Sequence, residues 1–327
     1  MIHSEQSERT PYAGSDARAY IQATKLISDI DFSGHDLHGL DFRDKIVVNC
    51  SFDNADMSGC QWTNADVLEC TFTKSNIGRE IMEAKGLAYT DLSGRDFSGM
   101  DFCGKDLSYA ILSECNLSGC NVTGANLMGL NVAGSDLSGT DLFSAAKTYG
   151  IDVSHLNWAG TDFSGKDLSG FRFMGCDLTG CNFQDAKLVY AGFYQATVSP
   201  EQLLESASLR GAYLYGLDFS QHDFSDQDLT NTKFIICNLE GCRFDQAKME
   251  GVVLVGSDVT NANVEDAAIL AGANLSGHDW SNRTFQCNIA FTDFCNCNLN
   301  GTVLPPAIGV LMDATATEYD TKSAMQA

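Results

Sequence analysis

The chain has few basic residues and no long hydrophobic run, and each of these absences argues against a class of protein. Its 327 residues include 20 Lys or Arg against 43 Asp or Glu, which gives a formal net charge of −23 at pH 7. Binding to nucleic acid through phosphate contacts needs a basic face, so direct nucleic-acid binding is not expected. No apolar stretch approaches the ~20 residues that cross a bilayer, so we expect no membrane span.

The sequence also lacks the common catalytic and metal-binding motifs. It contains no phosphate-binding loop of the GxxxxGKS type, no GxSxG nucleophile elbow and no HExxH motif. Its 13 cysteines include no CxxC pair and no Cys/His cluster with the ligand spacing of a zinc site. We therefore predict that the protein is not an enzyme and uses no cofactor or metal.

A large apolar residue stands at every fifth position over most of the chain, usually with Asp or Asn before it. A period of five fits neither a helix, at 3.6 residues, nor a flat strand, at 2, so each group of five must turn the chain. Such short repeats are typical of a solenoid, whose coils stack around a continuous narrow core. One unbroken run consists of Phe32, Leu37, Phe42, Val47, Phe52, Met57, Trp62, Val67, Phe72 and Ile77.

The motif resembles that of the pentapeptide-repeat proteins, in which a small residue and Asn or Asp precede Leu or Phe. The match is complete in stretches such as Ala125 to Gly129, Ser135 to Gly139 and Cys176 to Gly180. The resemblance covers roughly residues 31–304. It implies an all-β solenoid, a right-handed quadrilateral β-helix with four pentapeptides per coil, short helical or loop insertions and end caps.

The cysteines support this register, because eleven of them lie two residues before a central apolar residue, in a slot that Ala fills elsewhere. A free thiol is a small buried hydrophobe, so we predict that these cysteines pack in the core. Cys103 and Cys295 lie just after a central residue instead. Many free thiols without a secretory signal peptide indicate a cytoplasmic protein, in the bacterial cytosol or, for a secreted effector, in the host cytosol.

We predict three parts along the chain. Residues 1–30 form a flexible leader and an N-terminal helical cap, residues 31–304 form the β-helix, and residues 305–327 form a C-terminal cap or disordered tail. Interruptions divide the β-helix into five blocks, at residues 31–77, 91–142, 152–198, 212–269 and 273–304. Each block contains a related phrase near its start, such as DFSGHDL from Asp31, so a longer repeat is superimposed on the short one.

Short helices are expected at some interruptions. In the clearest case Ser199 caps the helix, Pro200 takes its first position and Gln202 reaches back to the cap. Weaker signals predict a helical turn in residues 78–85, and a cap helix from Asp16 with an apolar side of Ala17, Tyr20, Ile21 and Leu26. Residues 145–151 are expected to form a loop, with a one-residue insertion at residues 271–273 and a deletion at residues 287–289.

One recurrent departure from the motif is a candidate partner-binding site. The slot normally filled by Ala, Ser or Cys holds a basic side chain in each shared phrase, at His35, Arg95, Lys166, His222 and His278. A charge buried in so narrow a core is costly unless it is paired. Two interpretations are open: the side chains reach solvent or cover an adjoining insert, or they form a polar row that binds an anion or a partner.

The acidity has a partly local cause. About half of the 43 acidic residues are Asp directly before a central residue, where Asn also occurs, so this slot selects a short side chain that accepts hydrogen bonds from the turn. The surplus of carboxylates still produces a negative field around the protein.

The leading interpretation is a non-catalytic binding or scaffold protein that docks an unidentified protein on the faces and inter-block loops of a β-helical rod. The resemblance also implies a DNA mimic that inhibits or protects a type II topoisomerase such as gyrase, in a branch that forms homodimers through a C-terminal helix. A third interpretation is a recognition module, because the block layout is similar to pentapeptide-repeat regions of bacterial secreted effectors.

Overall fold

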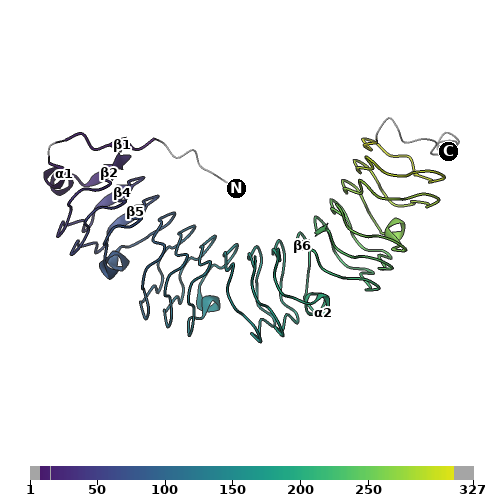
Figure 1. Ribbon diagram of the computed structural model, residues 1–327, viewed down its shortest axis with the longest axis horizontal. Coiled ribbons are helices and arrows are strands. Elements are labelled where there is room, and N and C mark those ends of the chain that lie inside the picture. Colours follow the sequence, from purple (N-terminus) through teal and green to yellow (C-terminus); the bar gives the residue numbers. More distant parts are fainter. Residues whose placement is uncertain (1–7, 15, 313–327) are drawn as a thin grey trace. The chain divides into compact units, whose positions relative to one another are not determined.

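The computed structural model describes residues 8–14 and 16–312, which belong to two compact units that divide after Leu156. Figure 1 shows that each unit is a stack of coils. Parallel bridges join residues one coil apart, such as Asp31 with Ser51 in the first unit and Asn238 with Asp258 in the second. This spacing of 20 residues agrees with the predicted four pentapeptides per coil.

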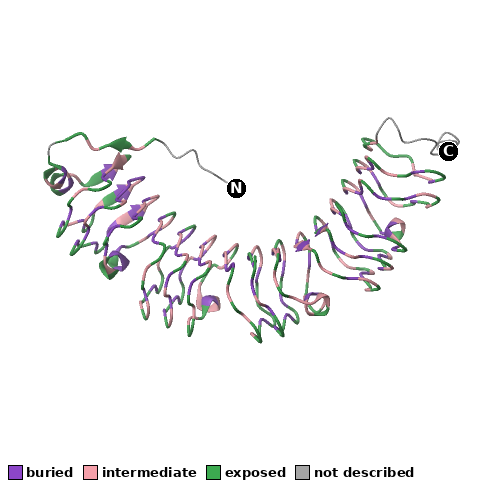
Figure 2. Ribbon diagram, viewed as in Figure 1, coloured by how far each residue is buried: buried purple, intermediate pink, exposed green. Residues whose placement is uncertain are grey.

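The central apolar residues of the repeat form the core of each unit, as the buried inner side of the coils in Figure 2 shows. Aromatic rings stack from one coil to the next, with centroids 4.2 Å apart for Phe42 and Trp62 and 5.1 Å apart for Phe52 and Phe72. Nine of the eleven cysteines predicted in the core are buried, and Cys287 and Cys297 are partly buried. Full burial of a central Leu or Phe side chain contributes roughly 1.5–3 kcal/mol to folding.

The turns use the predicted side-chain hydrogen bond. Asp31 Oδ1 accepts a bond of 2.9 Å from the backbone N–H of Ser33, and Asp218 Oδ1 accepts one of 3.0 Å from Ser220. The Gly that often follows Ser has a positive φ, 73° at Gly34, a conformation that other residues adopt at some cost. The Asp-x-Ser-Gly sequence is therefore a turn signal repeated along the chain.

In the first unit, β1 (Thr10–Pro11) pairs with β3 (Ile30–Asp31). A second parallel sheet contains, in order, β2 (Leu26–Ser28), β4 (Ile46–Val48) and β5 (Asp66–Leu68). The cap helix α1 (Ala17–Ala23) begins after Asp16, whose side chain accepts a bond of 3.0 Å from Ala19 N–H, as predicted. Leu26 was expected on the apolar side of this helix, but it lies in β2 and is 56% exposed.

In the second unit, β6 (Tyr213–Tyr215) pairs in parallel with β7 (Lys233–Ile235). Helix α2 (Pro200–Leu204) has the predicted capping box: Ser199 Oγ accepts from Gln202 N–H, and Gln202 Oε1 accepts from Ser199 N–H at 2.9 Å. Gln202 Nε2 also donates to the carbonyls of Leu178 and Cys181, so this side chain joins the helix to the preceding coil.

The short helices after α1 replace pentapeptides on one wall of the coil, which we call the helix wall. It carries Phe42 and Trp62 in the first unit and Phe163 and Phe183 in the second. The helices on it are η1 (Arg79–Glu83) and η2 (Leu142–Ser144) in the first unit, and α2 and η3 (Val264–Asp266) in the second. Each buries an apolar residue at the central position of this wall, in the order Met82, Leu142, Leu203 and Val264, and η1 also buries Ile81.

Each of these four core residues lies three coils after the one before it. The longer repeat in the sequence is therefore set by the regular spacing of the inserted helices. The predicted phrases are less evenly spaced, because they fall on different walls. An extra residue follows η2, α2 and η3, since the bridges there join residues 21 apart, such as Lys248 with Ile269.

Two predictions at the interruptions were wrong. Residues 145–151 were expected to form a loop, but they rejoin the coil, because Lys147 pairs with Asn126 and Tyr149 O accepts from Gly129 N–H; neither η2 nor η3 was expected. The insertion expected at residues 271–273 lies at η3 instead, and the buried central residue is Leu270 rather than Ile269. By contrast, the predicted deletion near Cys287 is confirmed, because Ile269 pairs with Asn288, 19 residues later. The division into five blocks stays a prediction, and the predicted tail after Met312 lies outside the described residues, as does most of the leader.

Candidate functional site

One wall of the second unit departs from the Asp-x-Ser pattern in five consecutive coils. Its outward residues flank the buried centres Phe173, Phe193, Leu214, Phe234 and Leu254. We call this surface the apolar wall. It consists of Arg172, Met174, Gly192, Tyr194, Tyr213, Tyr215, Lys233, Ile235, Val253 and Val255.

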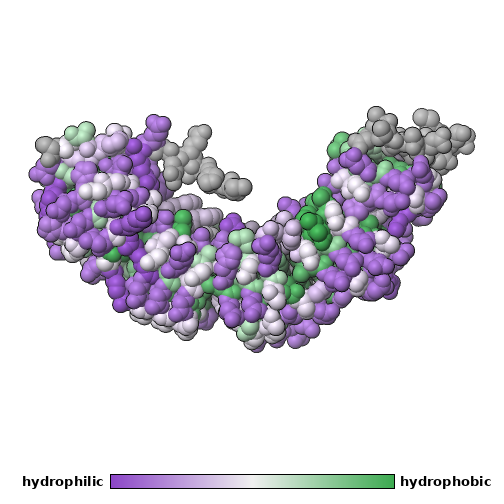
Figure 3. All heavy atoms as spheres, viewed as in Figure 1, coloured by the Kyte–Doolittle hydropathy of each residue, from purple (hydrophilic) through white to green (hydrophobic). Residues whose placement is uncertain are grey.

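The coil register aligns these residues into two columns. Arg172 pairs with Gly192, Gly192 with Tyr213, and Lys233 with Val253, while β6 pairs Tyr213 with Lys233 and Tyr215 with Ile235. The second column therefore contains Met174, Tyr194, Tyr215, Ile235 and Val255 in successive coils. Figure 3 shows hydrophobic side chains gathered in a strip on the second unit near β6.

The apolar wall is accessible and well ordered by its own contacts. Met174 is 40% exposed and Val255 is 42% exposed, and the neighbouring turn residue Ile236 is 56% exposed. The rings of Tyr194 and Tyr215 meet edge to face with centroids 4.6 Å apart, a favourable aromatic geometry. Tyr194, Tyr215 and Ile235 are half-buried between these exposed ends. A contiguous ladder of apolar side chains that are at least partly exposed is typical of an interaction surface.

The charge of the apolar wall is opposite in sign to that of the chain as a whole. Its charged members are Arg172 and Lys233, and it contains neither Asp nor Glu. Without Asp or Asn before the central residue, these turns lose the side-chain acceptor that stabilises turns on the other walls. In five consecutive coils this stabilising residue is thus replaced by Arg172, Gly192, Tyr213, Lys233 and Val253, of which the two basic residues are exposed and the others are half-buried.

The structure places the predicted polar row on different walls. His35 and Arg95 share a wall in the first unit, three coils apart, since Asp36 pairs with Asp56 and Asp96 with Asn116. In the second unit, Lys166 precedes Leu168, His222 precedes Phe224 on the helix wall, and His278 precedes Trp280 on a third wall. A contact of these residues with a partner stays a prediction, but they do not form one continuous row within either unit.

Several of these side chains bond to backbone carbonyls of the preceding coil. Arg95 donates to the carbonyls of Phe72, Ser75 and Ile77, next to η1. Burial lowers the pKa of its guanidinium, and the side chain lines a hollow of about 360 Å³. His278 lies with one ring nitrogen 3.0 Å from Ser257 O and the other 3.1 Å from Leu275 O. These contacts favour the first interpretation, in which the side chains cover adjoining structure.

Other basic residues beside the inserted helices also contact polar groups of those helices or of the residues at their ends. Lys105 Nζ donates to the carbonyl of Ala84 at the end of η1, with a length of 2.8 Å. Arg283 donates to Ala262 O and makes an ion pair of 2.7 Å with Glu265 of η3. His222 Nε2 lies 3.5 Å from Glu201 of α2. Inserted helices leave carbonyls without a partner in the coil ladder, and long polar side chains supply the missing donors.

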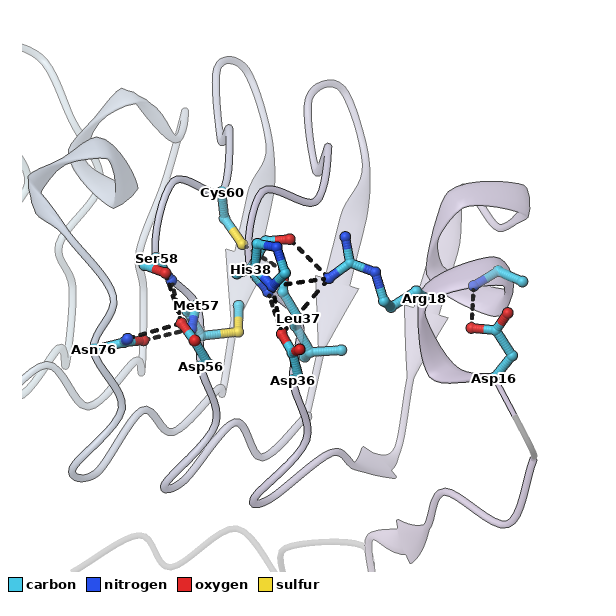
Figure 4. A network of polar contacts seen from close by, with 11 residues as sticks. Asp16, Arg18, Asp36, Leu37, His38, Asp56, Met57, Ser58, Cys60 and Asn76 are labelled. Atoms are coloured by element: carbon cyan, nitrogen blue, oxygen red, sulfur yellow. Dashed lines mark hydrogen bonds and ion pairs between the residues drawn. The ribbon is translucent and has the colours of Figure 1, made fainter.

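An exposed cluster in the first unit has the composition of a metal site, although sequence analysis did not single it out. Ligand atoms of Asp36, His38 and Asp56 lie within 4.8 Å of one another. Figure 4 shows that Arg18 of α1 points into this cluster, with its guanidinium 3.7 Å from Asp36 and bonded to His38 O. Asp56 also accepts bonds from Ser58 and Asn76. The cluster thus attaches α1 to the first coils through a positive charge that the chain itself supplies.

Burial keeps several of the cysteines unreactive, whereas a hydrogen bond from Cys70 lowers the pKa of Cys50. Burial raises the pKa of Cys60, Cys237 and Cys242 to about 11, which keeps these thiols protonated at neutral pH. Among the described residues, Cys103 is the one cysteine with an exposed side chain. No helix among these residues is long and apolar enough to cross a bilayer.

Sequence reasoning missed the apolar wall because it counted central residues and treated the rest of each pentapeptide as turn chemistry. The signal lies in the triplets around five successive centres: RFM, GFY, YLY, KFI and VLV. None has Asp or Asn in the first place or Ser or Thr in the last. A search for runs of pentapeptides that lack both turn residues would have found it.

A family of known sequences matches this chain. The model of pentapeptide repeats matches with 8 copies, within residues 87–124, 106–142, 152–191, 207–244 and 235–266. Curated proteins gave no match.

Solved structures similar to this chain include HetL, a pentapeptide repeat protein involved in heterocyst differentiation regulation from the cyanobacterium Nostoc sp. strain PCC 7120. It is 22% identical over 72% of this chain and 87% of its own, with a TM-score of 0.21. QnrB1, a plasmid-mediated fluoroquinolone resistance protein, is 18% identical over 68% of this chain and 94% of its own, with a TM-score of 0.22. The chain belongs to the pentapeptide-repeat family, whose members fold as right-handed β-helices.

Proposed function

We propose that the protein is a non-catalytic binding protein that docks another macromolecule on the apolar wall. The observation that carries this proposal is the ladder of Met174, Tyr194, Tyr215, Ile235 and Val255, whose two ends are exposed and whose three middle side chains are half-buried on the outer surface. Burial of apolar area contributes about 25 cal/mol per Å². A partner that covers the ladder would remove apolar area from water that stays exposed in the folded chain, and this would stabilise the complex. Tyr is also enriched where interfaces concentrate their binding energy.

The family scaffold suits this role. The interior of each unit is filled by side chains, so binding takes place on an outer surface. The inter-coil hydrogen bonds hold the wall in one geometry, and a preorganised surface loses little entropy when it binds. The inserted helices lie on the helix wall of the second unit, which leaves the apolar wall uncovered by them.

The test compares affinity capture by three forms of the full chain. The wall variant carries Tyr215→Thr and Ile235→Thr, which remove apolar surface and keep residues that favour strands. The matched control carries Ser220→Ala and Glu240→Ala on the adjoining wall. We expect proteins retained by the wild type and the control to be lost from the wall variant at unchanged circular dichroism. Equal retention by all three forms would contradict the proposal.

A second candidate function is a DNA mimic that acts on a type II topoisomerase. The observation in its favour is the set of exposed carboxyls such as Asp136, Asp162 and Asp223, which are ionised at neutral pH and whose pKa hydrogen bonds within the turns lower further. A gyrase supercoiling assay, with and without a fluoroquinolone, tests it at two salt concentrations. Salt-sensitive inhibition or drug protection supports it, and no effect at micromolar protein contradicts it for gyrase.

A further inference from the structure

We propose that the apolar wall receives an amphipathic helix of a partner protein, which lies along the coil axis and carries carboxylates toward Lys233 and Arg172. This inference rests on the proposed docking function and adds the kind of partner. Three features of the apolar wall lead to it: its dimensions, the use of its backbone hydrogen bonds, and its charge.

The dimensions fit one helix better than a second copy of this chain. Five coils at ~4.8 Å, with a three-residue strand on each, give a surface of about 25 Å by about 10 Å. An α-helix with its side chains is about 10–12 Å wide, and about 17 residues of it span this length. A stable interface between two proteins needs about 800 Å² on each partner, which is well above the area of this wall.

The coil spacing also matches the spacing of a helix face. Apolar residues three and four apart recur about every 5.4 Å along a helix, close to the ~4.8 Å between coils. The side chains of one helix face can therefore lie against the ladder of Met174, Tyr194, Tyr215, Ile235 and Val255 over its whole length, with a drift of about half a coil.

The backbone hydrogen bonds of the apolar wall favour a helix over an extended peptide. The wall uses its own backbone groups between coils: Phe193 N–H donates to Tyr213 O at 2.9 Å, and Phe234 N–H donates to Val253 O at 2.8 Å. An extended peptide laid on these side chains would find few partners for its N–H and C=O groups. A helix satisfies these groups internally, so it loses no hydrogen bonds when it leaves water.

The charges select an acidic helix. Lys233 and Arg172 lie three coils apart along one column of the wall, or about 14 Å. Residues about ten or eleven apart on a helix share a face and are separated by about 15–16 Å. Two carboxylates at that interval can therefore meet both cations, and the absence of acidic residues on the wall leaves nothing there to repel them.

The experiment measures fluorescence anisotropy of labelled synthetic peptides of about 18 residues with the full chain. The first probe is an amphipathic helix with a Leu face and two Glu about eleven residues apart. The second replaces both Glu with Lys, and the third has the composition of the first with two Pro inserted to prevent a helix. The protein forms are the wild type, Tyr215→Thr with Ile235→Thr, Lys233→Gln, and the Ser220→Ala with Glu240→Ala control.

We expect saturable binding of the acidic helix to the wild type and the control. The Kd should rise about tenfold or more in the Tyr215→Thr, Ile235→Thr form, as for loss of an interface centre, and about three- to tenfold in Lys233→Gln. The Lys-bearing probe will bind the acidic chain in a salt-sensitive way that no wall substitution changes. Equal affinity for the Pro-containing probe, or no difference between the wall variants and the control, would overturn the inference.

The two proposals fail in different ways. Wall-dependent capture of proteins, together with no saturable binding of the acidic helix, would contradict the helical partner and leave the docking wall in place. If neither wall-dependent capture of proteins nor saturable binding of the acidic helix is seen, the proposed docking function of the apolar wall is contradicted.

Discussion

Lys233 Nζ lies 6.0 Å from the centre of the Tyr213 ring, and the two residues pair in parallel register on β7 and β6. The ammonium group is therefore associated with an aromatic side chain in a wall without carboxylates, whereas the Asp-rich turns of other walls carry negative charge. At an exposed site such a contact contributes about 0.5–1 kcal/mol. Its main effect is to make this one surface of an acidic protein attractive to anionic groups.

Replacement of this cation should change binding more than folding. We expect Lys233→Glu to shift the free energy of unfolding by no more than about 1 kcal/mol, because the side chain is exposed. Urea unfolding followed by circular dichroism measures this. A loss of several kcal/mol would show that Lys233 has a structural role and would weaken the case for a binding surface.

Gln202 should matter more for stability than its position in a five-residue helix suggests. Its side chain completes the capping box and donates to the carbonyls of Leu178 and Cys181. Gln202→Ala leaves the Cys181 carbonyl unpaired, whereas the Leu178 carbonyl still accepts from Cys181 N–H, and we expect a cost of about 1–3 kcal/mol. Ser199→Ala removes only the cap and should cost about 1 kcal/mol.

Urea unfolding of both variants gives the comparison, with Gln184→Ala as the matched control because Gln184 is exposed in the preceding coil. Since repeat proteins need not unfold in one step, the midpoints should be followed by two probes. A smaller effect for Gln202→Ala than for Ser199→Ala would contradict the assignment of these bonds.

The thiols should divide sharply by reactivity. Burial raises the pKa of Cys60, Cys237 and Cys242 to about 11, whereas Cys103 is exposed. In the folded protein at pH 8, we expect Ellman's reagent to label Cys103 quickly and the buried cysteines only on unfolding. Cys103→Ser should remove the fast phase. Fast labelling of many cysteines would mean that the coils open readily in solution.

Stability should decline in acid through the turn carboxylates. Hydrogen bonds from Arg43 lower the pKa of Asp41 to about 2, and those from Ser58 and Asn76 lower the pKa of Asp56 to about 2. Because the folded values lie below the ordinary value near 4, this contribution is complete above about pH 5 and disappears as the pH falls toward 2. Thermal unfolding between pH 7 and 2.5 measures it. A rise in stability on acidification would show that repulsion among the carboxylates is the larger effect.

The same turns predict that Asp56→Asn is milder than Asp56→Ala. Asn keeps the oxygen that accepts from Ser58 N–H, and Asn occupies the equivalent place at Asn116 and Asn126. Ala has no acceptor. Thermal unfolding of the two variants at pH 7 should therefore place Asp56→Ala lower, and the reverse order would contradict the turn assignment.

The sequence predicted features whose cause is local. The period of five follows from one turn per pentapeptide, and the helix α2 follows from Ser199, Pro200 and Gln202. It did not predict η2 and η3, because Leu142 and Val264 continue the five-residue pattern and the extra residue appears only afterwards. Whether two insertions lie on the same wall depends on the number of residues in each coil between them. The extra residue at η3 shifts the register by one, so the sequence pattern wrongly predicted Ile269 as a central residue.

The basic residues of the polar row illustrate a second limit. They look alike in sequence because each stands two places before a central residue, yet Arg95 bonds to three carbonyls while His222 lies beside Glu201. Their surroundings depend on which wall they reach and on the nearest insert. The apolar wall, by contrast, could have been predicted from the sequence, because five central residues lack the usual Asp or Asn before them and Ser or Thr after them.

Site-specific photo-crosslinking tests the docking wall most directly. A photoreactive phenylalanine derivative at Tyr215, in cells that express the full chain, reports what contacts the wall, and the same group at Ser220 serves as the control on the adjoining wall. The account predicts a discrete crosslinked product from Tyr215 that is absent from Ser220. Products from Ser220 alone, or none from Tyr215 while other walls react, would contradict it.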